Sequence, residues 1–285
     1  MENFDPEKLK KLYIPPPNSH KGQNGKLLII GGSQLFHAAS LWSLTVASKI
    51  VDMVFYSSVP VNNELVKEAK KEFRNGIVIP RSKIEDYINE ADCILIGPGL
   101  PRKEGEEMGD DDTGTLTTQL LRKYPKKKWV IDGGSLQAVQ PEIITSNSIL
   151  TPHRKEFELL KLKIKNEKLK MKMQNLKLEE QVQVFAKEFN CVILLKGRVD
   201  IVSDGSKTIE IEGGNAGMTK GGTGDVLAGL VAALYCKNDA FLSAVAGSFI
   251  NKKAGESLFK KVGYYFNASN LANEIPKVMK EFLSQ

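Results

Sequence analysis

Short apolar segments alternate along the chain with longer segments in which apolar residues recur at helical spacing. The short segments, rich in Ile, Val and Leu, are 26–32, 53–58, 76–80, 93–99, 129–134, 148–152 and 191–197. The longer, helical segments are 38–50, 61–74, 115–123, 178–189, 225–235, 239–260 and 268–283. Several short segments, such as "KLLIIGG" and "CVILLKG", lack polar alternation, which is typical of strands covered on both faces. The pattern predicts an α/β fold with a mostly parallel central sheet and helices on both faces.

Three further segments depart from this alternation. Residues 199–212, "VDIVSDGSKTIEIE", form two alternating runs around a turn, which predicts a hairpin at the edge of the sheet. Residues 102–114 are acidic and rich in glycine, and 161–175 alternate Lys with apolar residues without a clean helical period. We expect both to be solvated surface insertions. The alternative for the acidic segment is a metal site, and the alternative for the lysine-rich segment is a basic partner surface.

Composition narrows the function classes. The net charge is +6 over 285 residues, but the excess comes from lysine clusters at 123–129 and 161–177, not from a basic stripe with interleaved aromatic residues. We therefore expect no nucleic-acid partner. The first twenty residues have no apolar core of a signal peptide and no apolar run is long enough to span a bilayer, so neither secretion nor membrane insertion is expected. No break in composition divides the chain, which predicts a single domain over residues 1–285.

The three cysteines lie inside apolar segments and lack the spacing of a metal or redox motif. They are Cys93, Cys191 and Cys236. This placement predicts reduced, buried side chains and a cytoplasmic protein.

Four of the predicted strands end in glycines or polar residues. These ends are 31–32, 97–99, 132–134 and 151–153. In an open parallel sheet the carboxyl ends of the strands border the ligand crevice, so we expect these residues to surround a bound molecule.

The segment "NAGMTKGGTGDVLAGLVAAL" (215–234) gathers glycines directly before an apolar helix. Gly221, Gly222 and Gly224 leave the backbone free of side chains, and the first amides of the helix have no intrahelical partner. Such a helix terminus suits a phosphate. Asp225 has two possible roles on these residues alone: it caps the helix, or it acts as a base beside a bound anion.

A phosphoryl-transfer site would use both features. Amides of residues 222–224 would hold the phosphoryl oxygens while Asp225 accepts the proton of an attacking hydroxyl. The chain has no GxxxxGK[ST] motif, and "GGSQLFHAA" does not fit GxGxxG, so neither common nucleotide fingerprint is present.

Six segments, in order, together resemble the ribokinase-like superfamily, and within it the ADP/ATP-dependent NAD(P)H-hydrate dehydratases. They are "SHKGQNGKLLIIGGSQLFHAAS", "ILIGPGL", "VIDGGSL", "ILTPHRKEFELL", "VILLKGRVDIVSDG" and "NAGMTKGGTGDVLAGLVAAL". The resemblance implies a ribokinase-like fold and repair of hydrated NADH or NADPH (NADHX, NADPHX). In that reaction ATP or ADP, with Mg²⁺, phosphorylates the ring hydroxyl and phosphate is then eliminated. The alternative is a thiazole or hydroxymethylpyrimidine kinase of the same superfamily, although the Thr-Pro-His-x-x-Glu form at 151–156 favours the dehydratase.

The resemblance also implies roles for individual residues. Asp225 is the base and contacts the substrate, and Ala38, Gly99 and His153 line the substrate site. The nucleotide-binding residues are Lys196, Gly197, Arg198, Val199, Asp200, Gly222, Thr223 and Gly224. Glu156 is a candidate for ordering magnesium. Relatives suggest a homo-oligomer, and any epimerisation of the substrate would need a separate protein.

Each role has a simpler alternative. His153 can end a strand with a local hydrogen bond, and Lys196 can point into solvent at a strand end. The chain also departs from the family pattern: Gly134 replaces a second acid after Asp132, and Lys220 stands where a small residue is commoner. Lys220 either contacts nucleotide phosphates or points to solvent.

Overall fold

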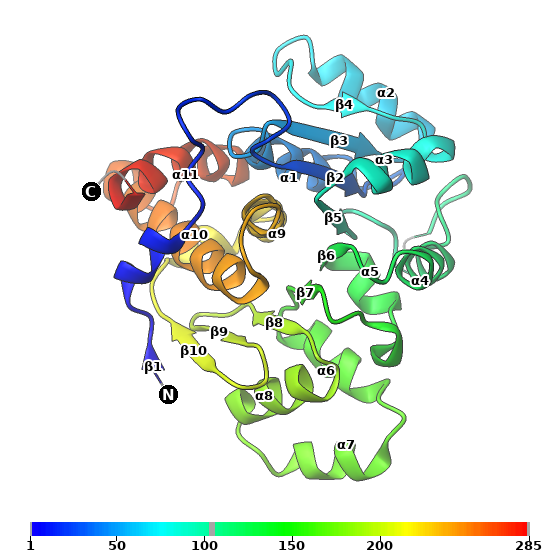
Figure 1. Ribbon diagram of the computed structural model, residues 1–285, viewed down its shortest axis with the longest axis vertical. Coiled ribbons are helices and arrows are strands. Elements are labelled where there is room, and N and C mark those ends of the chain that lie inside the picture. Colours follow the sequence, from blue (N-terminus) through cyan, green and yellow to red (C-terminus); the bar gives the residue numbers. More distant parts are fainter. Residues whose placement is uncertain (1, 103–105, 284–285) are drawn as a thin grey trace.

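A ten-stranded sheet crosses the described part of the protein, residues 2–102 and 106–283 of the computed structural model (Figure 1). The strands are β1 (Glu2–Asn3), β2 (Lys26–Ile30), β3 (Met53–Ser57), β4 (Ile77–Val78), β5 (Cys93–Ile96), β6 (Lys128–Ile131), β7 (Ser148–Leu150), β8 (Val192–Leu195), β9 (Asp200–Ser203) and β10 (Thr208–Ile211). Their order in the sheet is β1-β10-β9-β8-β7-β6-β5-β2-β3-β4. All of the predicted strands are present.

Strands β4 to β8 and β2 and β3 run parallel, as the sequence predicts. The predicted hairpin is also confirmed: β9 and β10 pair antiparallel, and β9 joins the sheet antiparallel to β8. Chain order reverses between β2 and β5, because the chain runs outward from β2 to β3 and β4, and then from β5 toward β8. Ligand crevices of open parallel sheets form at such a reversal.

The described residues form helices on both faces of the sheet. They are α1 (Ala38–Ala47), α2 (Pro60–Ala69), α3 (Ile84–Glu90), α4 (Thr113–Lys123), α5 (Gly133–Ala138), α6 (Arg154–Leu162), α7 (Glu167–Gln174), α8 (Leu178–Glu188), α9 (Thr223–Tyr235), α10 (Ala240–Val262) and α11 (Ala268–Leu283). The seven predicted helices are present. The sequence pattern did not predict α3, α5, α6, α7 or the two-residue strand β1; α3 and α5 have only 7 and 6 residues, too few for a periodicity to be visible.

Most residues of 161–175 are exposed, as expected for a surface insertion, but the segment is helical and packs on the protein. These residues complete α6 and form α7, which packs against α8. Leu169 and Met173 are buried, and because they are four residues apart they lie on one face of α7. The lysines between them occupy the other positions and conceal this apolar stripe in the sequence.

The acidic segment lies at the surface, with residues 106–109 exposed as expected, and specific bonds anchor its aspartates; its residues 103–105 lie outside the described residues. The Asp110 carboxylate accepts from the amide of Gln34 at 2.7 Å. Asp111 pairs with Arg81. Asp112 caps α4 through the amide of Thr115. Each of the three aspartates 110–112 therefore has a structural partner.

Alternate residues of each central strand enter different cores. Leu27 and Ile29 of β2 pack in a cluster with α1, α9, α10 and α11. Leu28 and Ile30 pack on the opposite face, in a cluster formed mainly with α3 to α8. Both faces are thus covered, which explains why the strands are apolar without alternation. The three cysteines are free and buried in these cores, as expected.

Helix α9 packs on the sheet between its neighbours α1 and α10, which also contact the sheet, and is seen end-on in Figure 1. All of its residues from Val226 to Tyr235 are buried. A helix enclosed in this way needs an apolar surface all round, which accounts for the sequence "VLAGLVAALY". Its last carbonyls accept from the Lys128 ammonium, with a distance of 2.8 Å to the Tyr235 oxygen. In the described ranges no helix is long and apolar enough to cross a membrane.

Replacement of Gly229 by Ala tests this packing. A Cβ at Gly229 would lie 2.6 Å from Ser43 Cα and 2.7 Å from Ser43 O in α1, and backbone atoms cannot move aside easily. Overpacking of this kind costs about 1–3 kcal/mol, so we expect Gly229→Ala to lower Tm by roughly 3–10 °C in a thermal unfolding scan. Gly221→Ala is the matched control, since an added Cβ there meets nothing within 4 Å. Equal Tm values for the two variants would contradict the close approach of α1 and α9.

Candidate active site

The glycine and polar strand ends predicted from the sequence lie along one edge of the sheet. They follow the adjacent strands β2, β5, β6 and β7, and Lys196 follows β8. The ends of β2 and β5 are joined by a hydrogen bond of 2.8 Å from the amide of Gly32 to the carbonyl of Pro98. His153 and Lys196 continue the parallel pairing of β7 and β8 by one bridge. The strand ends therefore lie side by side along this edge, where the sequence predicts the ligand crevice.

Helix α9 begins at this crevice with backbone that only glycine tolerates. Gly222, its N-cap, has φ 93°. A Cβ on Gly222 would lie 2.3 Å from the ring of Trp42 and 2.8 Å from Ala268. Both the left-handed conformation and the close contact with Trp42 therefore require glycine here.

The first amides of α9 are available to a ligand. Thr223 is used internally: its hydroxyl donates to the carbonyl of Met218 at 2.6 Å, and its amide donates to the carbonyl of Lys220 at 3.4 Å. Within residues 2–102 and 106–283, no acceptor pairs with the amides of Gly221, Gly222 or Gly224. A helix of 13 residues directs its positive end at these amides. The arrangement suits an anion, in agreement with the sequence-based prediction.

Asp225 stands in the first turn of α9 beside these amides. Burial and the nearby charge of Asp132 raise its pKa to about 7, against the opposing effect of Lys196. No side-chain cap hydrogen bond forms at this helix end, whose N-cap is Gly222, so Asp225 does not serve as the N-cap. A carboxyl group with a pKa near neutrality is suited to accept a proton at physiological pH.

Lys196, whose side chain is 18% exposed, and the buried Asp132 form an ion pair at this edge of the sheet. The Lys196 ammonium lies 2.8 Å from Asp132 Oδ1, and the hydroxyl of Thr151 donates to the same oxygen at 2.7 Å. Burial alone would lower the pKa of Lys196, but the carboxylates of Asp132, Glu156 and Asp225 outweigh it and raise the pKa. The alternative of a solvent-directed Lys196 is thus wrong.

The missing second acid after Asp132 has a steric explanation. A Cβ on Gly134 would lie 2.3 Å from the carbonyl oxygen of Leu100 and 3.0 Å from that of Pro101. The start of α5 therefore approaches the loop after β5 too closely for any side chain at position 134. Asp132 alone remains at the end of β6.

His153 and Glu156 form a capping box at the start of α6. The amide of Glu156 donates to His153 Nδ1 at 3.2 Å, and the amide of His153 donates to Glu156 Oε2 at 3.0 Å. The local hydrogen bond considered for His153 is therefore present. Because Nδ1 accepts, the neutral ring carries its proton on Nε2, and 44% of the side chain is exposed. Glu156 is buried, with Arg102 4.0 Å from its Oε1.

A magnesium ion would need oxygen ligands from outside this chain. In the part that the structure describes, no group of three His, Cys, Asp or Glu residues could hold a metal. Mg²⁺ is commonly bound by one or two carboxylates together with substrate phosphates. Glu156, Asp132 and Asp225 influence the same ammonium. The acidic residues thus fit Mg²⁺ brought in with a nucleotide.

Residues Gly197 to Asp200 form a tight turn between β8 and β9. Asp200 closes the turn by accepting from the amide of Gly197 at 2.8 Å, and its other oxygen accepts from Ser248 at 2.7 Å. Lys252, a buried lysine of α10, donates to the carbonyls of Gly197 and Arg198. Asp200 therefore shapes the turn from within, while Gly197 and Arg198 are exposed. The sequence reasoning missed Lys252, although a lysine pair inside an otherwise apolar helix signals its special position.

Ala38 and Gly99 lie on the α1 side of the crevice. Gly99 has φ 71°, and a Cβ on it would lie 2.8 Å from the carbonyl oxygen of Phe36, so the segment before Ala38 rests on Gly99. One turn further along α1, Trp42 touches Gly222 and Ser43 donates to the carbonyl of Asp225 at 2.7 Å. Helix α1 thus connects the predicted substrate residues with the predicted phosphate site.

Lys220 is held away from the glycines. Its ammonium donates to the carbonyl of Tyr264 and lies 5.3 Å from the centroid of the Phe266 ring. Lys220 is therefore exposed, as in the solvent alternative, but its ammonium is anchored to the segment before α11.

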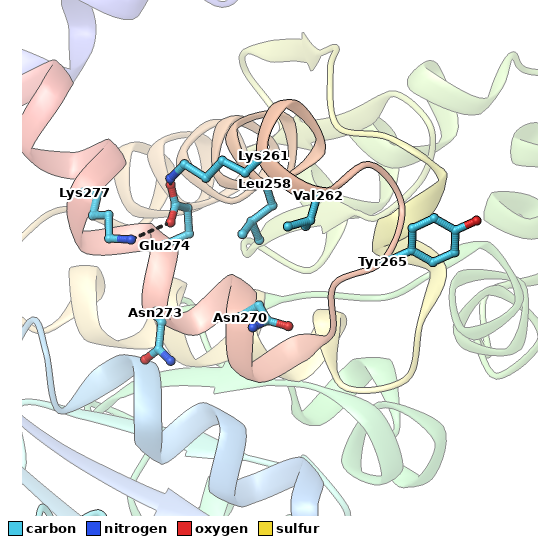
Figure 2. A pocket seen from close by; sticks show the side chains of 8 residues that line it. All are labelled: Leu258, Lys261, Val262, Tyr265, Asn270, Asn273, Glu274 and Lys277. Carbon is cyan, nitrogen blue, oxygen red and sulfur yellow. Dashed lines mark hydrogen bonds and ion pairs between the residues drawn. The ribbon is translucent and has the colours of Figure 1, made fainter.

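A separate cavity of about 260 Å³ lies between α10 and α11 (Figure 2). Lys261 and Lys277 converge on the carboxylate of Glu274, which also accepts from Ser257 at 2.7 Å. These bonds outweigh burial and lower the pKa of Glu274 to about 2. The cluster ties two helices together, and none of the crevice residues lines this cavity.

Comparison with known proteins agrees with the geometry. A family model described as NAD(P)H-hydrate dehydratase matches residues 27–277. The chain belongs to the NAD(P)H-hydrate dehydratase family. It is 36% identical to the bifunctional NAD(P)H-hydrate repair enzyme Nnr of Methanocaldococcus jannaschii, over 96% of this chain and 52% of the relative. It is also 36% identical to the ADP-dependent (S)-NAD(P)H-hydrate dehydratase of Nitrosopumilus maritimus, over 96% of both chains. The chain thus spans about half the length of the bifunctional relatives of this family.

Solved structures share the ribokinase-like fold of this family. The ADP/ATP-dependent NAD(P)H-hydrate dehydratase of Bacillus subtilis, co-crystallised with ATP/Mg²⁺, superimposes with a TM-score of 0.77 at 21% identity, covering 98% of each chain. A hydroxyethylthiazole kinase from Pyrococcus horikoshii gives a TM-score of 0.63 at 14% identity, covering 98% of this chain and 95% of its own. The predicted fold is confirmed.

The raised pKa of Asp225 implies that the stability of the folded protein depends on pH. Between the ordinary Asp value of 3.8 and about 7, the folded protein retains a proton that the unfolded chain releases. Stability is therefore lost as pH rises through this window, and the buried charge remains costly above it. We expect Asp225→Asn to raise Tm relative to the unsubstituted protein at pH 8, and to change it less at pH 5.

Asp204 supplies a control of opposite sign. Burial raises its pKa, but hydrogen bonds from Lys207 and Ser206 outweigh this and lower it, so its carboxylate stabilises the fold at neutral pH. Asp204→Asn should lower Tm at pH 8. A lower Tm for Asp225→Asn at that pH would contradict the conclusion that burial and the charge of Asp132 destabilise the ionised Asp225 carboxylate.

Proposed function

We propose that this protein dehydrates NADHX and NADPHX, restoring NADH and NADPH at the expense of ATP or ADP. The observation that carries the proposal is the placement of Asp225, a carboxyl group with a pKa of about 7, beside the unpaired amides that begin α9. Membership of the family and relatives named for this reaction support the substrate class.

The nucleotide would lie across the turn after β8 and the start of α9. Its terminal phosphoryl group would lie against residues 222–224, where the unpaired amides of Gly222 and Gly224 and the helix dipole favour negative charge. Its adenosine part would lie against the exposed turn of Gly197, Arg198 and Val199, with Asp200 holding that turn. The substrate would lie against Ala38, Gly99 and His153, on the other side of Asp225.

The first step transfers a phosphoryl group to the hydroxyl of the hydrated ring. The ring oxygen attacks phosphorus, the bond to the departing ADP or AMP oxygen breaks, and Asp225 accepts the hydroxyl proton. A positioned base of this kind typically contributes about 10²–10⁴-fold to the rate. Stabilisation of charge on the moving phosphoryl group by fixed amides supplies much of the remainder.

The second step restores the ring double bond. The carbon–oxygen bond to the new phosphate breaks and phosphate departs with the electron pair, while the neighbouring ring carbon loses a proton. Hydroxide is a poor leaving group and phosphate a good one, which explains why dehydration would consume a nucleotide. The overall products are NADH or NADPH, inorganic phosphate, a proton and the nucleotide shortened by one phosphoryl group.

Magnesium bound with the nucleotide would neutralise charge on its phosphates. Glu156 is the residue we propose to help order the ion, because its buried carboxylate lies beside His153 and interacts with Lys196. Assembly as a homo-oligomer, a cytoplasmic location and epimerisation by a separate protein stay predictions.

A repair assay tests the proposal. Purified protein with NADHX, Mg²⁺ and ATP or ADP should restore the absorbance of NADH and release one phosphate per NADH formed. Asp225→Asn should lower kcat by about 10²–10⁴-fold, because the hydroxyl proton then has no acceptor. Nucleotide affinity, measured by calorimetry, should change little.

Two outcomes would count against it. Full activity of Asp225→Asn would remove the base. A stable phosphorylated product from a thiazole or pyrimidine alcohol, with no response to NADHX, would identify the small-molecule kinase instead. Gly221→Ala is the matched control for the fold of this loop, because its added Cβ meets no neighbour within 4 Å.

The pH dependence of kcat/KM tests the state of Asp225. Only the ionised carboxyl can accept a proton, so kcat/KM should rise with pH through about 7 and level off above it. Asp132, Lys196 and Glu156 face the same group, and each influences this value. The profile is measured from pH 5.5 to 8.5 at saturating nucleotide, and a flat profile would contradict a base of this pKa.

A further inference from the structure

The geometry assigns Lys196 to the transferred phosphoryl group, with Asp132 as the residue that positions it; we propose this pair as the cationic half of the phosphoryl site. The inference rests on the proposed function. It differs from the role that the family resemblance implies, in which the segment containing Lys196 contacts the adenosine part of the nucleotide.

The first observation is where the Lys196 side chain ends. Its Nζ lies 3.6 Å from the position that a Cβ on Gly224 would occupy. Gly224 is the second residue of α9, so the ammonium stands over the same turn of backbone whose amides are unpaired. The residues after Lys196 go elsewhere: Gly197 and Arg198 fold into the turn held by Lys252. The Lys196 side chain and the turn that follows it are therefore placed to contact different parts of a ligand.

The second observation is that the ammonium keeps donors free. A lysine ammonium has three N–H donors, and among the described residues Asp132 is its one hydrogen-bond acceptor. A largely buried ammonium with unused donors beside unpaired amides is suited to phosphoryl oxygens, since charge-assisted hydrogen bonds are the strong ones.

The third observation is the charge of the crevice. Asp132, Asp225 and Glu156 are all near enough to influence Lys196. Three carboxylates would repel a nucleotide, and the dipole of α9 supplies only about half a positive charge. Lys196 is the cation that these carboxylates share, so it offsets their repulsion at the point where phosphate must enter.

Asp132 acts through Lys196 in this arrangement. Its Oδ1 accepts from both Lys196 and Thr151, which anchors the carboxylate and directs the ammonium toward α9 instead of toward the nearby Glu156. Asp132 is therefore a positioning residue, while Lys196 contacts the reacting group.

Affinities for ADP and AMP, compared by calorimetry with Mg²⁺ and without hydrate, test the assignment. A lysine on the terminal phosphoryl group of ADP makes no contact with AMP of the same kind. Lys196→Met should therefore weaken the affinity for ADP at least tenfold and change the affinity for AMP by no more than about twofold. Equal losses for ADP and AMP would place Lys196 on the adenosine part, and no loss for either would overturn the assignment.

A double-mutant cycle tests Asp132. Alone, Asp132→Asn should weaken the affinity for ADP and not for AMP. Added to Lys196→Met it should have no further effect, because both residues act through one ammonium. Additive effects would overturn the positioning role. Lys220→Met is the matched control: this lysine also adjoins the glycines, but its ammonium is bonded to the carbonyl of Tyr264, so the ADP-to-AMP ratio should not change.

These measurements separate the two proposals. Selective loss of ADP affinity with no turnover of NADHX by the unsubstituted protein would support the Lys196 assignment and reject the proposed function. If the unsubstituted protein turns over NADHX but Lys196→Met loses affinity for ADP and AMP equally, the proposed function is supported and the Lys196 assignment is rejected. Failure of the unsubstituted protein to bind either nucleotide would reject both.

Discussion

The ion pair between Lys196 and Asp132, 2.8 Å apart beneath the first turn of α9, is the interaction on which the crevice depends. It brings the ends of β6 and β8 together and places one positive charge among three carboxylates. Without it, Asp132 would stand buried and uncompensated beside Asp225, and such a carboxylate would disfavour any bound anion. With this ion pair, the same crevice combines Asp225, a base whose pKa is about 7, with a site suited to phosphate.

Helix α9 fixes the position of this site relative to the core of the molecule. Its apolar body is enclosed by the sheet and by α1 and α10, so its first turn cannot move independently of the core. The glycines before Asp225 then serve two purposes: they leave amides bare, and Gly222 allows Trp42 of α1 to pack against the backbone. Because the same helix α1 begins at Ala38, the proposed substrate and phosphate sites are parts of one rigid unit, which favours direct transfer between bound molecules.

Several polar residues of the site also hold its shape through bonds within the protein. Asp200 closes the turn after β8 and Lys252 binds its carbonyls. His153 and Glu156 cap α6. Asp110 and Asp111 fasten the acidic segment to the loop after β2 and the end of β3. Sequence motifs do not distinguish such residues from ligand contacts, since both kinds are polar and lie at strand ends. Only the hydrogen-bond partners separate them.

The amino-acid sequence by itself determined strands β2 to β10, seven of the helices, the two-sided sheet and the glycine and polar strand ends at its carboxyl edge, because apolar periodicity and glycine placement are local properties. The ordered motifs likewise identified the family. Periodicity failed where elements were short, as in α3 and α5, or where lysines concealed a buried stripe, as in α7. The tertiary structure alone decided that Lys196 turns to Asp132, that Gly134 has no room for an acid and that Lys220 binds Tyr264. Each of these depends on atoms brought together from distant parts of the chain, and no local pattern records such distances.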